Sequence, residues 1–211
     1  MVKKVFDYLS SNNKTISFAE SCTGGNLSSS ISKIPGASKI FIGSIVSYSK
    51  FSKKNILKID ESELDNYSTV SEEITIKMAE SVKQKLKTDY SIAITGNAGP
   101  SVDSPGTNLG DCFVAIMSDN EIFCQKFQFD CNREDFINLA TNNSFQLFFD
   151  KIIKFYKIYK RKQKVRDKFE LISTIKNIEE LKIICKKLKI PESEYQDKTN
   201  SNVQIIKLIT N

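Results

Sequence analysis

The chain has 211 residues, of which 40% are hydrophobic and 27% charged, a composition typical of a globular protein with one ordinary domain and a smaller appendage. It contains no histidine, which excludes serine–histidine and cysteine–histidine catalysis and argues against a zinc hydrolase. The five cysteines show no C-x-x-C spacing, so neither a disulfide framework nor a metal site is predicted. With no long apolar run and no signal-peptide pattern, we expect a cytoplasmic protein without a membrane partner.

The formal net charge of +6 is distributed unevenly along the chain. Residues 151–211 carry 16 lysines and arginines against 7 acidic residues, whereas residues 1–150 carry 15 against 18. The basic character therefore belongs to the C-terminal part, and we expect no nucleic-acid binding by the main body.

Hydrophobic periodicity and capping residues predict alternating helices and strands over residues 1–160. Helices are expected near the N-terminus and at 26–34, 53–57, 61–66, 71–86 and from 132 onward; strands are expected at 15–18, 39–47, 90–94, 112–117 and 122–129. This order predicts an α/β fold, namely a layered α/β/α domain with a central mixed sheet. Residues 161–211 are expected to form a basic linker and a small all-α module.

The stretch Ala19-Glu20-Ser21-Cys22-Thr23-Gly24-Gly25 lies where the first strand passes into a helix. A hydroxyl at Ser21 would project near helix N-terminal N–H groups that can stabilise an oxyanion or a phosphate, which makes Ser21 a candidate nucleophile. The same residues equally suit a helix cap and a glycine turn. Cys22 is interpreted as a small core residue, because it has no histidine partner.

Two further polar segments follow strands and are expected to converge with Ser21, namely residues 48–53 and 95–99. Without histidine, a serine can still be activated by a neutral lysine amine, and Lys50, Lys53 and Lys54 are the candidates. A lysine serves as a base only if a desolvated pocket or a neighbouring cation lowers its pKa. Like charges in this run could help to depress the pKa of one lysine, although such a run also suits a solvated face. Tyr48 would orient a proton or simply present a wet hydroxyl at a strand end.

The segment Thr95-Gly96-Asn97-Ala98-Gly99-Pro100 offers unobstructed backbone N–H groups for a phosphate or carboxylate, or forms a structural turn. It lacks the P-loop spacing, so ATP binding is not indicated. Arg133 is the only arginine in the first 160 residues, and it could hold a phosphate with two parallel hydrogen bonds.

Taken together, five blocks resemble the CinA C-terminal domain family, the nicotinamide-mononucleotide amidases. The blocks match in order over about residues 5–155: Ala19–Gly25, Ile34–Ser38, Val46–Ser49 with Lys53, Val70–Glu73 and Thr95–Pro100. The resemblance implies an α/β domain, commonly dimeric, that hydrolyses the carboxamide of nicotinamide mononucleotide to nicotinate mononucleotide and ammonia without a metal or other cofactor.

Carried over by motif, the resemblance implies Ser21 as nucleophile and Lys53 as general base, supported by Tyr48 and Thr95. Substrate contacts would come from Thr23, Gly24, Gly25, Gly96, Asn97, Ala98, Gly99 and Arg133, with the N–H groups around Thr23 to Gly25 as oxyanion donors. The chain departs from the family pattern at Lys50 (usually Asn), Asn97 (usually Ile), Ile137 (usually a second Arg) and the stretch 101–110. These departures concern the substrate more than the nucleophile.

Residues 165–211 lie outside this resemblance. Their helical patterns are faintly similar to death-like effector-associated domains, which recruit partners by helix packing. Such amphipathic helices are common, however, and a plain helical cap on the enzyme is the favoured interpretation. An alternative function is therefore a catalytically altered nucleotide-binding or adaptor protein whose C-terminal module recruits a protein partner.

Overall fold

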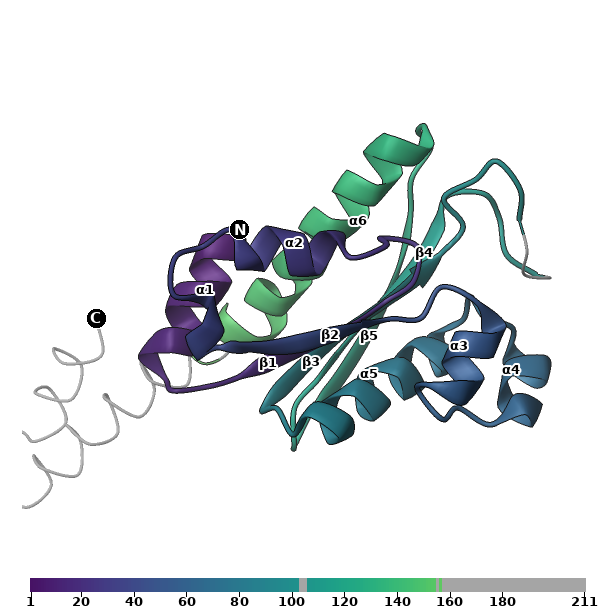
Figure 1. The fold of residues 1–211 in the computed structure, drawn as a ribbon. Helices are drawn as coiled ribbons and strands as arrows, with labels where there is room; N and C mark the ends of the chain where they lie inside the picture. The colour runs from purple at the N-terminus through teal and green to yellow at the C-terminus, as the bar shows by residue number, and fades with distance from the viewer. Residues whose placement is uncertain (103–105, 155, 157–211) are drawn as a thin grey trace, which may run out of the picture. The chain divides into compact units, whose positions relative to one another are not determined.

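The structure is a computed structural model that describes residues 1–102, 106–154 and 156. Residues from Met1 to Ile153 form one compact unit, shown as the coloured ribbon in Figure 1. The predicted C-terminal module, residues 161–211, lies outside the described residues. Within the described part of the chain, no helix is long and apolar enough to cross a membrane.

A five-stranded sheet with the order β2-β1-β3-β4-β5 forms the centre of the domain. β1 (Ile16–Glu20) pairs in parallel with β2 (Phe41–Val46) on one side and with β3 (Tyr90–Gly96) on the other. β4 (Asp111–Met117) and β5 (Ile122–Gln128) continue the sheet in antiparallel pairing. The predicted mixed sheet is confirmed.

Helices cover both faces of this sheet, which confirms the layered α/β/α prediction (Figure 1). One face carries α1 (Val2–Ser11), α2 (Asn26–Ser32) and α6 (Arg133–Phe148). The other carries α5 (Glu72–Leu86) together with the short helices α3 (Lys50–Asn55) and α4 (Glu61–Tyr67). Side chains alternate along β1, so that Phe18 packs into the core beneath α2 and α6 while Ala19 packs into the core beneath α5.

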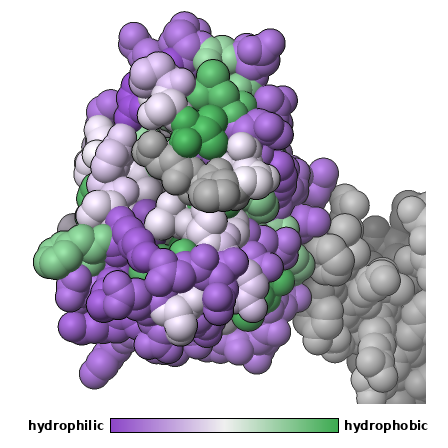
Figure 2. Space-filling model, turned by 90° about the vertical axis from the view of Figure 1, so that its right-hand side faces the viewer, coloured by the Kyte–Doolittle hydropathy of each residue, from purple (hydrophilic) through white to green (hydrophobic). Residues whose placement is uncertain are grey.

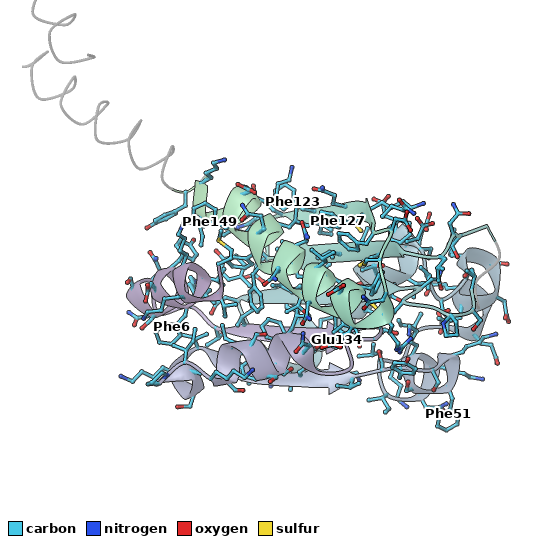
Figure 3. The ribbon with its side chains drawn as sticks, turned by 90° about the horizontal axis from the view of Figure 1, so that it is seen from above. Phe6, Phe51, Phe123, Phe127, Glu134 and Phe149 are labelled. Carbon is cyan, nitrogen blue, oxygen red and sulfur yellow. The ribbon has the colours of Figure 1, made fainter. Side chains whose placement is uncertain are left out.

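Aromatic side chains fill the core beneath α6. The buried Phe18 ring stacks on Phe41 with centroids 5.0 Å apart and meets Phe145 of α6 edge-on at 6.0 Å. Phe123 and Phe127 of β5 and Phe149 pack against the same cluster, and Figure 3 shows them gathered along α6. This packing fixes α6, and with it Arg133 at the start of that helix, against the sheet.

Two predicted details are corrected by the structure. α3 begins at Lys50 rather than at residue 53, because Ser49 and Ser52 form a reciprocal capping box around its first turn. The apolar spacing from Phe136 to Phe155 predicts that Leu139 lies on the inner side of the last helix. Leu139 is instead 40% exposed, because that side is set by Phe136 and Ala140. α6 is followed by a π-helical turn, Phe149–Ile153, and the predicted inner residue Phe155 lies outside the described residues.

Candidate active site

The carboxyl ends of β1 and β3 meet at a small polar cavity. Ser21 follows β1 directly, and its backbone N–H donates to the carbonyl of Ile94 in β3 at 3.0 Å. The cavity has a volume of about 220 Å³ and is lined by Ser21, Cys22, Tyr48, Lys53, Thr69, Val70, Thr95, Gly96, Asn97, Ala98, Gly99, Ser101 and Arg133. The three polar segments predicted from the sequence therefore converge. Figure 2 faces the side of the domain with α3, α4 and the loop after β3, where the surface is mainly hydrophilic.

Ser21 and Lys53 are in direct hydrogen-bond contact at the base of this cavity. Lys53 Nζ lies 2.9 Å from Ser21 Oγ and donates to the carbonyl oxygen of Ser47 at 2.8 Å. Lys53 is 1% exposed and Ser21 is 7% exposed. The capped helix α3 carries the lysine to this position, since its first turn starts at the end of β2 and directs Lys53 inward.

Burial lowers the pKa of Lys53 from 10.5 to about 8. The neighbouring lysines do not produce this shift, contrary to the possibility raised by the sequence. Lys50 is ion-paired with Asp65 and Lys54 with Glu61, and all four side chains are substantially exposed. Desolvation therefore makes the Lys53 amine a usable base near neutral pH, because about a tenth of it is then uncharged at pH 7.

Tyr48 and Arg133 form a pair at the cavity mouth. The Arg133 guanidinium donates through Nη2 to the Tyr48 hydroxyl at 2.5 Å and through Nη1 to the Gly99 carbonyl at 2.6 Å. Tyr48 therefore holds Arg133 and makes no direct hydrogen bond to Ser21 or Lys53 within the described residues. Thr95 also lines the cavity and is buried, and its hydroxyl donates to the Thr69 carbonyl at 2.9 Å.

Glu20 supports the turn that carries Ser21, and the sequence predicted no role for it. It is fully buried, and its carboxylate accepts hydrogen bonds from the Thr23 hydroxyl and from the backbone N–H groups of Gly25, Leu27 and Ser28. The Ser28 and Ser44 hydroxyls also donate to it. The sequence did contain a signal for this role. Glu20 is a carboxylate at the end of a buried strand, a few residues before a helix that begins after two glycines, where its charge can bind helix N-terminal N–H groups.

This arrangement corrects the expected oxyanion donors. The N–H of Gly25 is bound to Glu20, and the N–H of Gly24 donates to the Ser21 carbonyl at 3.0 Å. Thr23, Gly24 and Gly25 are also absent from the cavity lining. Among the described residues, no acceptor receives the N–H of Cys22, which follows the nucleophile and lines the cavity. That N–H group is available to a ligand.

The Cys22 side chain belongs to the hydrophobic core cluster. It is 5% exposed, and the neighbouring Cys22 thiol together with burial raises the pKa of the buried Cys112. Cys22 thus anchors the turn in the core, as predicted.

We expect Glu20→Gln to lower the free energy of unfolding by about 2–4 kcal/mol, because an amide nitrogen would replace an acceptor that several buried donors need. Chemical denaturation measures this change. Glu134→Gln serves as the matched control, since Glu134 is exposed in the first turn of α6 (Figure 3), and we expect a loss below about 1 kcal/mol there. Equal stability of the two variants would contradict the role assigned to Glu20.

The fold and the site define a class of protein: a mixed α/β domain with a buried serine–lysine pair at the carboxyl ends of its central strands. Residues 1–152 match the family model described as the CinA C-terminal domain. The chain belongs to this family. A CinA-like protein of Flavobacterium psychrophilum is 40% identical over 142 residues, which cover 67% of this chain and 34% of the relative.

Solved structures agree with this assignment. A CinA superfamily protein from Escherichia coli aligns with a TM-score of 0.65 at 28% identity, covering 66% of this chain and 81% of that chain. A competence or damage-inducible protein from Enterobacter asburiae aligns with a TM-score of 0.69 at 28% identity, covering 71% and 94%. The chain spans about a third of the length of the curated relatives that it matches.

Proposed function

We propose that this domain is an amidohydrolase that converts the carboxamide of nicotinamide mononucleotide, or of a related pyridine nucleotide, to the carboxylate and ammonia. The observation that carries the proposal is the 2.9 Å contact between Ser21 Oγ and a buried lysine amine whose pKa is lowered to about 8. A neutral amine at this distance can take the serine proton, which is the role that histidine fills in other serine hydrolases.

In the proposed mechanism, Ser21 Oγ attacks the amide carbon while Lys53 Nζ accepts the hydroxyl proton. The Cys22 N–H donates to the developing oxyanion. In other strand-to-helix nucleophile turns, the residue directly after the nucleophile supplies the same backbone donor. As the C–N bond breaks, Lys53 returns the proton to the leaving nitrogen and ammonia departs. Water then attacks the acyl ester, with Lys53 again as the base, which releases the carboxylic acid and restores Ser21.

The size and charge of the cavity support a pyridine nucleotide as substrate. A volume of about 220 Å³ is below the range of roughly 300–1,000 Å³ usual for ligand pockets, so it suits only the amide-bearing end of a nucleotide. The phosphate would then lie at the mouth, where Arg133 is held by Tyr48 and Gly99. Arginine has five N–H donors, so further donors remain for a phosphate oxygen.

Incubation of the purified full chain with nicotinamide mononucleotide, followed by an ammonia assay, tests the proposal. The dinucleotide, the free base and glutamine provide a panel of other amides. We expect ammonia from the mononucleotide in preference to the free base and glutamine. Absence of ammonia from every pyridine nucleotide would refute the amidohydrolase assignment.

The pH dependence of the reaction should report the protonation of Lys53. Only the neutral amine can accept the Ser21 proton, so kcat/KM should rise with pH and level off above the Lys53 pKa of about 8. Between pH 6 and pH 8 we expect an increase of about 50-fold, because the neutral fraction grows about tenfold per pH unit below the pKa. A kcat/KM that stays constant over this pH range would contradict Lys53 as the base.

Arg133→Ala should weaken recognition of the phosphate without changing the amide chemistry. We expect KM for nicotinamide mononucleotide to rise about 10- to 100-fold, because the variant loses a charge-assisted pair of hydrogen bonds to the phosphate. Nicotinamide riboside, which lacks the phosphate, is the matched substrate, and its kcat/KM should change less than about threefold. If both substrates lose activity equally, Arg133 instead acts through the position of Tyr48 and Gly99.

A further inference from the structure

The side-chain amide of Asn97 is locked in one orientation beside the cavity. Asn97 is 5% exposed, and its Nδ2 donates to Thr107 Oγ1 at 2.7 Å and to the Asn108 carbonyl oxygen at 3.2 Å. A carbonyl oxygen can only accept, so the side-chain atom that faces it must be the amide nitrogen. Both N–H groups of Asn97 are therefore committed to the protein.

The remaining polar atom, Asn97 Oδ1, is an acceptor on a residue that lines the cavity. No donor from the described residues reaches it. Asn97 Oδ1 is also not sealed from solvent. Among the described residues, the fully buried side-chain oxygens and nitrogens without a partner are Ser47 Oγ and Asp111 Oδ1. Since Asn97 lines the cavity, its free oxygen meets the cavity interior.

The register of the sheet places Asn97 relative to the nucleophile along the strand direction. Glu20 pairs with Ile94, so Ser21 is level with Thr95. Asn97 continues the pairing beyond β3, because its N–H donates to Asp111 and its carbonyl accepts from Gly110, both at 2.8 Å. Thr95 and Asn97 therefore share one face of the strand, and Asn97 lies about 7 Å beyond the level of Ser21.

This spacing is measured along the strand direction, and a carboxamide that reaches from Ser21 toward Asn97 has a comparable length. A carbonyl carbon about 3 Å from Ser21 Oγ, a C–N bond of about 1.3 Å and an N–H···O contact of about 2.9 Å together span up to about 7 Å. The neighbouring Gly96 keeps the strand this close to β4, since a Cβ there would lie 2.6 Å from the Asp111 carbonyl oxygen.

We propose that Asn97 Oδ1 accepts a hydrogen bond from the amide nitrogen of the substrate and selects carboxamides over esters and carboxylates. This inference rests on the proposed function of the site. An ester has an oxygen in place of the amide nitrogen. That oxygen and Asn97 Oδ1 are both acceptors, so no hydrogen bond can form between them. The carboxylate product creates the same conflict, with added negative charge, and this favours its release after hydrolysis.

Binding measurements in a Ser21→Ala background test the inference without turnover. The ligands are nicotinamide mononucleotide and the methyl ester of nicotinate mononucleotide, and calorimetry gives the two Kd values. We expect the amide to bind about 10- to 100-fold more tightly than the ester. In Ser21→Ala/Asn97→Leu the two Kd values should agree within about threefold. Ser21→Ala/Thr107→Val, which keeps Oδ1 and the Asn108 contact, should retain the preference for the amide.

Three results would overturn the inference: no binding of the amide, a preference that persists in Asn97→Leu, or an equal loss of affinity for both ligands in that variant. The last result would assign to Asn97 only a role in shaping its loop. Failure of the proposed function has a different signature, because a chain that binds the amide selectively but releases no ammonia recognises carboxamides without hydrolysing them.

Discussion

Ser21→Ala should reduce ammonia release from nicotinamide mononucleotide by about 10⁴- to 10⁶-fold, with little change in the Kd of the substrate. The reason is geometric. Ser21 Oγ is the hydroxyl that lies 2.9 Å from the Lys53 amine and opens into the cavity, whereas the Thr95 hydroxyl is bound to the Thr69 carbonyl. Steady-state kinetics at pH 9, where Lys53 is mostly neutral, gives the comparison.

The matched control for this variant is Ser29→Ala. Ser29 is an exposed serine on α2, and its removal should leave kcat/KM within about twofold of the parent value. If Ser21→Ala retained more than about a tenth of the activity, the reaction would not pass through a serine ester.

Lys53→Met should abolish turnover to a similar extent while leaving the fold intact. Methionine matches the length and apolar stem of lysine, so the site stays filled, but no base remains to take the serine proton. Lys54→Met is the matched control. Lys54 is the adjacent lysine, exposed and paired with Glu61, and we expect no loss of activity there. Equal losses in the two variants would contradict the assignment of Lys53 as the base.

The same substitution should raise stability at neutral pH. Because the pKa of Lys53 is lowered from 10.5 to about 8, burial of its charged form below pH 8 costs roughly 3 kcal/mol. The unfolded chain binds the proton more tightly, so stability should rise with pH between about 8 and 10.5. Allowing for the lost hydrogen bonds to Ser21 and Ser47, we expect Lys53→Met to gain about 1–2 kcal/mol at pH 7.

Denaturant unfolding at pH 7 and at pH 10 measures this difference. The gain of Lys53→Met over the parent should shrink at pH 10, where the parent amine is neutral in the folded state. A variant that is less stable than the parent at both pH values would show that the buried amine contributes to folding rather than opposing it.

The sequence predicted the sheet and the convergence of its polar strand ends because each depends on local patterns. Strand-like runs before Ser21 and before Thr95 placed both residues at carboxyl ends, and parallel pairing of β1 with β3 then brings those ends together. Because the chain has no histidine, a lysine was predicted as the general base, and the structure places Lys53 rather than Lys50 or Lys54 beside Ser21.

Other features depend on contacts that no local pattern encodes. The role of Glu20 requires donors from α2 and from Ser44 of β2, which only the folded turn brings together. The locked amide of Asn97 requires Thr107 and Asn108, ten and eleven residues further along the chain. The lowered pKa of Lys53 is an effect of burial, whereas the sequence showed only a cluster of lysines.

Two expectations from the sequence stay predictions. A homodimer and a protein partner for residues 165–211 both concern contacts beyond the described part of the single chain. Sedimentation of the full chain, and of the chain ending near residue 160, would measure the first.

The most direct measurement of the central claim is the mass of the protein after rapid acid quench of its reaction with nicotinamide mononucleotide. We predict a transient adduct equal to the substrate minus ammonia, attached to the peptide that contains Ser21, and absent in both Ser21→Ala and Lys53→Met. Ammonia release without any adduct on Ser21, or an adduct that forms equally well in Lys53→Met, would contradict the account.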